Sequence, residues 1–303
     1  MSRLLGIAVV QRTILEGGAE ANLGEVEITL DKIAFQYPWV DLVVMPELTL
    51  QGFGGAPVEE QAEAIPGPIT YRIGKKAKEI KKWIVAGSML EKDGERVYNT
   101  IPVFSPEGEI VATYRKMNPY SPLEPTTEGT ECVVFEIPGL GKIGLANCYD
   151  LWFPELSRSL VSMGADVILH PSLTPSTLIG RETLTRSSMA MLNQVYVVGA
   201  SCCGPCNGLA TAGRSIIVDP DGTVMQEAGD APSIMIDMLD LDRVKAAREV
   251  GIKGIAPVYK HINHYKQKWP VYGNQMATSP YISSFGSPYE LVDDLNKIED
   301  KEV

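Results

Sequence analysis

The sequence has few basic residues and no long apolar run. Its 303 residues include 27 lysines and arginines against 38 aspartates and glutamates, which gives a formal net charge of −11. Because nucleic-acid binding requires clustered lysine and arginine, this balance argues against a nucleic-acid partner. No apolar stretch reaches the length of a membrane-spanning helix, so we expect no membrane partner. The apolar start of the chain is interrupted by Gln11 and Arg12, which predicts a first strand and not a signal peptide.

Cysteine is also scarce. The chain has five cysteines, an odd number, and three of them crowd together at Cys202, Cys203 and Cys206. No disulfide framework fits that arrangement in a chain of this length, so we expect a reducing, cytoplasmic location. The three cysteines are similar to part of a zinc site that His261 and His264 could complete. Zinc sites of this kind usually take paired cysteines from two segments, and no second pair exists, so we predict no metal.

Apolar, β-branched runs alternate with helical spacing through most of the chain. The first half begins with a strand at 4–10, a helix at 21–35 and a strand at 42–45. The other predicted elements continue the alternation, with helices at 70–82, 155–163 and 182–194, and strands at 84–88, 97–104, 110–114, 167–169, 196–200 and 215–218. This alternation is typical of an α/β protein.

Two short segments of the first half return in the second half in the same order. The run 41–46 is echoed at 165–171, and the turn-containing run 103–108 is echoed at 217–222, at similar offsets. Either echo alone is weak, because turns rich in proline and glycine are common. Together they predict two pseudo-symmetric αββ halves, with two sheets packed face to face and helices outside in a four-layer αββα sandwich.

The periodic pattern ends near residue 254. The segment 255–303 carries aromatic residues among prolines, namely Tyr259, Tyr265, Trp269, Tyr272, Tyr281, Phe285 and Tyr289. It has too little periodicity for a core of its own, and large aromatic side chains are favoured anchors at protein interfaces. We therefore expect one domain over 1–254 and an extended tail over 255–303 that contacts another subunit of a homodimer or larger homo-oligomer.

Three reactive side chains stand where predicted strands end. Glu47, Lys116 and Cys148 each follow an apolar, β-branched run. The segment after Cys148 has the pattern of a helix start, and a helix N-terminus favours a thiolate. A carboxylate at the end of a buried strand needs a cationic partner, which Lys116 supplies. An acid, an amine and a thiol together indicate a nucleophilic hydrolase in which Glu47 takes the proton of the thiol.

Each of these residues also has a plainer interpretation. A free cysteine is most often a buried structural residue, Glu47 could be a solvated loop carboxylate, and Lys116 could be a solvated strand-end lysine. The polar neighbours of Cys148 favour the nucleophile. His170 ends another predicted strand and stays open as an alternative base, although no motif supports it. The run 139–144 fits a dinucleotide-binding pattern, but a strand follows it where a helix is needed, which favours a hairpin turn.

The three segments resemble the signature segments of the nitrilase superfamily, the carbon–nitrogen hydrolases. They are Pro46-Glu47, Tyr114-Arg115-Lys116, and the run from Cys148 to Glu155, and the resemblance covers about residues 4–250. It implies a Glu47–Lys116–Cys148 triad that forms a thioester with a small-molecule amide. It also implies that Lys116 and the backbone N–H of Tyr149 stabilise the oxyanion. No cofactor is expected, because a thiolate and a carboxylate suffice.

The run from Lys116 to Glu124 resembles the aliphatic amidase and formamidase branch. There, Glu124 matches a second glutamate that positions substrate, and Tyr120 matches an aromatic pocket wall. The run from Cys148 to Trp152 departs from that branch and looks more like the ω-amidase and carbamoyl-type branches. In those branches position 152 is often an arginine that meets a substrate carboxylate, and Trp152 removes that charge. The resemblance therefore favours a small, neutral aliphatic amide, hydrolysed to a carboxylic acid and ammonia.

Three other functions stay open at this point. An N-carbamoyl-amide hydrolase uses the same triad. A nitrilase is disfavoured, because nitrilases typically follow the cysteine with Trp-Glu and this chain has Tyr149-Asp150. A catalytically silent scaffold with the same fold is disfavoured, because a scaffold has no need of an acid, an amine and a thiol at three strand ends.

Overall fold

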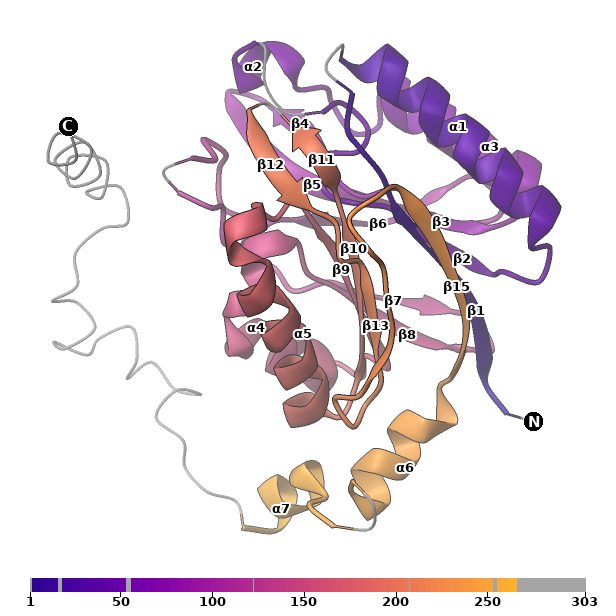
Figure 1. Ribbon diagram of the computed structural model, residues 1–303, viewed down its shortest axis with the longest axis vertical. Helices are drawn as coiled ribbons and strands as arrows, with labels where there is room; N and C mark the ends of the chain where they lie inside the picture. The colour runs from indigo at the N-terminus through magenta and orange to yellow at the C-terminus, as the bar shows by residue number, and fades with distance from the viewer. Residues whose placement is uncertain are drawn as a thin grey trace, which may run out of the picture.

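Two twisted β-sheets lie face to face, and helices cover the outer face of each sheet (Figure 1). This computed structural model describes residues 2–15, 18–52, 56–121, 123–206, 208–252 and 255–265. The arrangement confirms the predicted four-layer αββα sandwich. Among the described residues, no helix is long and apolar enough to cross a membrane.

The first sheet has seven strands, and its first three are parallel. The last strand of the described residues returns to this sheet and pairs antiparallel with the first strand. Across the sheet, the strands are β15 (Ser233–Asp240), β1 (Leu4–Gln11), β2 (Leu42–Val44), β3 (Trp83–Val85), β5 (Arg96–Phe104) and β4 (Met89–Asp93), with β6 (Ile110–Arg115) also on β5.

The second sheet has six strands with a parallel trio at β8, β9 and β10. Across the sheet, the strands are β14 (Val224–Glu227), β13 (Ile216–Val218), β10 (Tyr196–Ser201), β9 (Val167–Ser172), β8 (Gly141–Leu145) and β7 (Val134–Ile137). A separate small hairpin joins β11 (Cys203–Cys206) to β12 (Leu209–Ala212).

The internal repeat is visible in the strand topology. Each half has three parallel strands followed by an antiparallel hairpin, β5–β6 in the first half and β13–β14 in the second. The two echoed turns close these hairpins with the same bonds: Gly108 N–H donates to Ser105 O, and Gly222 N–H donates to Asp219 O. Both glycines have a left-handed φ, 87° and 83°, which suits glycine. The repeated sequence therefore encodes a repeated supersecondary unit.

Four helices form the outer layers. The first sheet is covered by α1 (Ala19–Gln36) and α3 (Pro68–Ile80), and the second by α4 (Pro154–Ser162) and α5 (Ile179–Asn193) (Figure 1). Proline occupies the first position of α3 and of α4, where its missing N–H costs no hydrogen bond. The remaining helices are α2 (Val58–Gln61), α6 (Asp242–Val250), α7 (Val258–Tyr265), and the short 3-10 helices Cys148–Trp152 and Ser176–Leu178.

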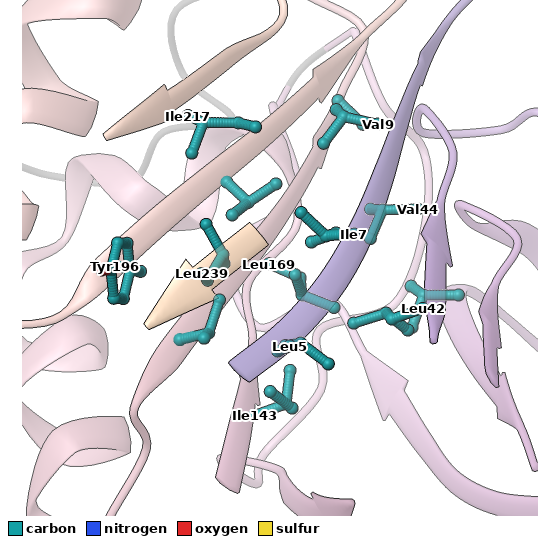
Figure 2. Packing of buried hydrophobic residues seen from close by; sticks show 14 of the residues in the cluster. Leu5, Ile7, Val9, Leu42, Val44, Ile143, Leu169, Tyr196, Ile217 and Leu239 are labelled. Carbon is teal, nitrogen blue, oxygen red and sulfur yellow. The ribbon is translucent and has the colours of Figure 1, made fainter. Parts of the chain in front are cut away.

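Apolar side chains fill the space between the sheets and under each helix layer. In β1, Leu5, Ile7 and Val9 face the second sheet, whereas Ala8 and Val10 face the helices. Figure 2 shows this central layer, where side chains of both sheets meet. Strands with both faces buried read as continuous apolar runs, which is why the sequence pattern located them.

Several strands were missed by the sequence pattern. The strands β4, β7, β11, β12 and β15 were not expected. In β15 only Met235 and Leu239 are buried, so the strand is neither a continuous apolar run nor a regular alternation. Its place beside β1 follows from long-range pairing, which local periodicity does not encode.

Only the beginning of the predicted tail lies within the described residues. There, Tyr259 of α7 packs on the cluster under α4 and α5, and its ring lies 5.2 Å from the Arg158 guanidinium. This part of the tail thus rests on its own subunit. Residues 266–303 lie outside the described residues, so the division at 254 and the contact of the tail with another subunit stay predictions.

The central layer should dominate stability. Ile7 is fully buried between the sheets, and Ile28 on the outer face of α1 is 63% exposed. We expect Ile7→Ala to lower the free energy of unfolding by about 2–5 kcal/mol, through lost apolar burial and a cavity. The control Ile28→Ala should change it by less than about 0.5 kcal/mol. Urea unfolding measures both, and equal effects would contradict the assigned core.

Candidate active site

Seven of the residues that the sequence singled out line one cavity. Its volume is about 90 Å³. The predicted residues in its wall are Glu47, Lys116, Tyr120, Glu124, Cys148, Tyr149 and Trp152. Glu47 follows β2, Lys116 follows β6 and Cys148 follows β8, so residues from both sheets meet at one edge of the sandwich.

A buried ion cluster forms the centre of the site. Lys116 Nζ lies 2.8 Å from Glu47 Oε1 and 2.6 Å from Glu124 Oε2, and the lysine side chain is 1% exposed. Burial alone would lower the pKa of Lys116, but Glu124 and Glu47 outweigh it and hold the pKa well above its usual value. Lys116 therefore stays positively charged, as an oxyanion-stabilising group requires.

The two carboxylates have different proton affinities. Burial raises the pKa of Glu47, and the charge of Glu124 adds to the rise while Lys116 opposes it. Burial acts on Glu124 too, but Lys116, the Tyr120 N–H and Asn99 outweigh it and lower the pKa of Glu124. Glu47 also interacts directly with the thiol of Cys148. Glu47 is thus the carboxylate placed to take a proton.

Cys148 sits on a strained turn. It begins the 3-10 helix Cys148–Trp152 with φ 50°, a conformation that non-glycine residues rarely adopt. Asp150 holds the turn, since its carboxylate accepts hydrogen bonds from the Asn147 N–H at 3.0 Å and the Tyr114 hydroxyl at 2.6 Å. Such a turn presents the side chain of Cys148 to the cavity.

The thiol differs from the expectation of a favoured thiolate. Burial raises the pKa of Cys148 well above its usual value, Glu47 adds to the rise, and Lys116 only partly opposes it. The start of the short helix does not offset these effects. The thiol is therefore protonated at rest, and its proton must pass to a base during the reaction.

His170 lies behind the nucleophile and not beside its sulfur. Its Nε2 is 2.7 Å from the carbonyl oxygen of Cys148, and its Nδ1 accepts a hydrogen bond from Arg186 at 3.0 Å. Burial lowers the pKa of His170 to about 4. With both ring nitrogens engaged, the geometry does not support the alternative in which His170 is the base.

The sequence pattern missed Asn99 and Glu182. Asn99 Nδ2 donates to Glu47 Oε1 at 2.9 Å and to Glu124 Oε1 at 2.7 Å, so it spaces the two carboxylates. An asparagine inside the apolar run of β5 could have indicated a functional residue at that position. Glu182 lines the cavity from α5 and accepts a hydrogen bond from Trp152 Nε1 at 3.1 Å. Its sequence context is that of any exposed helix residue, so no signal marked it.

Aromatic rings form one wall of the cavity. The ring of Tyr149 packs edge-on against Tyr120 at 5.1 Å between centroids and lies 5.8 Å from Trp152. Leucines and a proline form the rest of the apolar lining, namely Leu48, Leu123, Leu173, Pro175, Leu178 and Leu209. Among the described residues that line the cavity, Lys116 is the single cation.

The clustered cysteines lie near the site without forming a metal centre. Cys202 is buried and its thiol donates to the backbone carbonyl of Glu47 at 3.4 Å. Cys203 and Cys206 lie at the two ends of β11. In the part of the chain that the structure describes, no group of three or more His, Cys, Asp or Glu residues is arranged to hold a metal ion.

Comparisons with known proteins show the family of the chain. Residues 6–249 match the family described as carbon–nitrogen hydrolase. The chain is 30% identical over 255 residues to omega-amidase NIT2 of Danio rerio, covering 80% of this chain and 91% of that protein. It is also 30% identical over 246 residues to 2-oxoglutaramate amidase of Bacillus subtilis, covering 80% and 93%.

Solved structures share the fold of the chain. Nit3 of Saccharomyces cerevisiae, described as a member of branch 10 of the nitrilase superfamily, matches with a TM-score of 0.77 and 26% identity, over 82% of this chain and 94% of that chain. An amidase of Nesterenkonia sp. AN1 matches with a TM-score of 0.71 and 23% identity, over 82% and 94%. That amidase carries the acetamide moiety of fluoroacetamide on its active-site cysteine. At this identity the likeness concerns the fold alone.

Because Glu47 and Glu124 differ in proton affinity, we expect their substitution to affect the thiol of Cys148 differently. Glu47→Gln should slow alkylation of Cys148 by iodoacetamide about tenfold or more at pH 7, because it removes the base beside the thiol. Glu124→Gln should slow it clearly less, because Glu124 contacts Lys116 and not the thiol. Mass spectrometry of time points measures both rates. Equal slowing would show that Glu47 is not the base for the thiol with Glu124 acting only on Lys116.

Proposed function

This chain belongs to the carbon–nitrogen hydrolase family and hydrolyses carbon–nitrogen bonds other than peptide bonds, and from that premise we propose that it is a cysteine-dependent amidase. The proposal rests on one observation. The ion cluster of Glu47, Lys116 and Glu124 shares a small cavity with the half-buried thiol of Cys148. A base, a fixed positive charge and a nucleophile are the groups that acyl transfer requires.

In the first half-reaction, Glu47 takes the proton of the Cys148 thiol as the sulfur attacks the amide carbonyl carbon. The carbonyl π electrons move to oxygen, and Lys116 with the backbone N–H of Tyr149 stabilises that oxyanion. The intermediate then collapses and its carbon–nitrogen bond breaks. Glu47 returns the proton to the leaving nitrogen, so ammonia departs and a thioester remains on Cys148.

In the second half-reaction, water replaces ammonia. Glu47 takes a proton from water as the water oxygen attacks the thioester carbonyl carbon, and the same oxyanion contacts form. The carbon–sulfur bond breaks, the carboxylic acid leaves, and the proton returns from Glu47 to the sulfur. Glu124 orients Lys116 and the substrate throughout. The overall change is amide plus water to acid plus ammonia, with no cofactor in the scheme.

We infer that the substrate is a small, neutral aliphatic amide. The cavity is small, and the one cation in its described lining already pairs with two carboxylates. On the aromatic wall, Trp152 donates its N–H to the buried carboxylate of Glu182. A substrate carboxylate at that wall would meet the like charge of Glu182, which already pairs with Arg186 at 3.4 Å outside the cavity lining, and unpaired buried charge is costly.

An ω-amidase is the second candidate. Relatives that match at about 30% identity over most of their length are named omega-amidase or 2-oxoglutaramate amidase. Those names indicate substrates that carry a free carboxylate in addition to the amide. The wall of Trp152 and Glu182 argues against such substrates here, and a direct comparison of substrates decides between the candidates. An N-carbamoyl-amide hydrolase or a nitrilase would use the same nucleophile on a different group.

The role of the nucleophile is tested by Cys148→Ser. We expect ammonia release to fall on the order of 10³-fold or more, because Ser is a far poorer nucleophile with this base. The fold should persist, because the change is nearly isosteric. Circular dichroism checks the fold, and Cys132→Ser is the matched control that should keep full activity. Activity above a few per cent of the original would remove Cys148 from the mechanism.

The pocket assignment is tested by substrate preference. We expect kcat/KM for formamide, acetamide and propionamide to exceed that for succinamate and α-ketoglutaramate. Trp152→Ala should admit longer acyl chains, gaining about tenfold in kcat/KM for each of them relative to acetamide, while Trp152→Phe keeps a ring and should gain little. A preference for the dicarboxylic ω-amides in the unmodified protein would overturn this assignment but leave the triad standing.

A further inference from the structure

We propose that His170 and Arg186 are positioning residues that build the oxyanion site, by fixing the peptide unit that joins Cys148 to Tyr149. The inference deepens the proposed function and rests on it. Neither residue lines the cavity. They act from the opposite side of the backbone, through the carbonyl of Cys148.

The proton of His170 can be located from its neighbour. Arg186 Nε donates to His170 Nδ1 at 3.0 Å, and a guanidinium has donors only. Nδ1 must therefore be the acceptor, and the ring proton of the neutral imidazole lies on Nε2. That Nε2–H points at the Cys148 carbonyl oxygen, 2.7 Å away, and donates to it.

Arg186 is itself held rigidly. It is fully buried in α5, and its Nη2 donates to Ser172 Oγ at 2.6 Å and to Ser201 Oγ at 3.1 Å. The guanidinium packs on Gly199, where an added Cβ would lie 2.5 Å from Cζ of Arg186. The carboxylate of Glu182 lies 3.4 Å from Nη2 and balances the buried charge. The second sheet thus provides a fixed support for His170.

The held carbonyl determines where the proposed oxyanion donor points. The C=O of Cys148 and the N–H of Tyr149 belong to one planar trans peptide, so they point in opposite directions. With the C=O fixed toward His170, the N–H points away from His170, to the side where Cys148 and Tyr149 line the cavity. Hydrogen bonds in series polarise one another, so the donated bond also strengthens this N–H as a donor.

The same contact explains how Cys148 keeps its unusual backbone. A non-glycine residue at φ 50° is disfavoured and persists where its surroundings hold it. Asp150 holds one side of the turn, through the N–H of Asn147. His170 holds the other side, through the carbonyl of Cys148. The nucleophile and the oxyanion donor are thereby oriented by a single peptide unit.

The kinetic test separates oxyanion stabilisation from thiol activation. His170→Phe removes the donor, and we expect kcat for acetamide to fall about 10- to 100-fold, the usual effect of removing an outer positioning contact, while KM changes less than threefold. Alkylation of Cys148 by iodoacetamide forms no oxyanion, so its rate should stay within about threefold. His170→Gln keeps a side-chain N–H near Nε2 and should recover part of kcat.

The control is Tyr196→Phe. It removes another buried hydrogen bond of the second sheet, from the Tyr196 hydroxyl to the Asp240 carbonyl, and should leave kcat unchanged. Unchanged kcat in His170→Phe would overturn the proposal. A parallel loss of alkylation and turnover would also overturn it, because His170 would then support the whole turn and not the oxyanion. If His170→Phe does not fold, the tautomer of His170 in the unmodified protein decides the proposal.

The tautomeric state of the His170 ring is a second test of the proposal, and it does not depend on turnover. The chain has three histidines, so the signals of His170 in 15N-histidine NMR spectra are identified by their loss in His170→Gln. We expect the Nε2–H tautomer with no titration near pH 6.5, the usual value for histidine. The Nδ1–H tautomer would overturn the proposal. If no amide yields ammonia with the unmodified protein, the proposed function fails, whereas this spectrum still tests the support of the peptide.

Discussion

The pairing of Lys116 with two carboxylates is the constraint on which the site depends. A buried ammonium is costly unless its charge is matched, and here Glu47 and Glu124 both lie within 2.8 Å of it. Burial raises the pKa of Glu47 and of the Cys148 thiol, neighbouring carboxylates add to the rise, and Lys116 partly opposes it. The resting nucleophile is therefore protonated, and Glu47 is the carboxylate beside it that can accept the proton.

The sandwich brings these groups together because its two halves have the same topology. Glu47 follows the middle strand of the first parallel trio, and Cys148 follows the first strand of the second trio. Side chains at the carboxyl ends of parallel strands gather at one edge of a sheet, and face-to-face packing brings two such edges together. The cavity lies between the halves, and each half supplies part of the chemistry: base and cation from the first, nucleophile and its backbone support from the second.

The sequence predicted what local pattern and short motifs encode. Doubly buried strands such as β2 and β9 are apolar runs, and Glu47, Lys116 and Cys148 stood at strand ends, so the layers and the residues of the cavity were found. The half-exposed strand β15 has no clear alternation, and its pairing with β1 is long-range. Contacts that depend on packing were missed for the same reason: Asn99 is a polar residue in an apolar run, but no local pattern shows that it contacts two carboxylates or that His170 faces a carbonyl.

The pairing of β1 with β15 has a consequence for biosynthesis. The register joins Leu4 to Asp240 and Gln11 to Ser233, so the strand made first is completed by one of the last. On the ribosome, one edge of β1 stays unpaired while most of the chain is translated, and an apolar unpaired edge is a template for aggregation. Pairing across such a sequence separation is also slow. The first sheet is therefore completed only after most of these residues have been translated, and until then the open edge of β1 is exposed to wrong pairing.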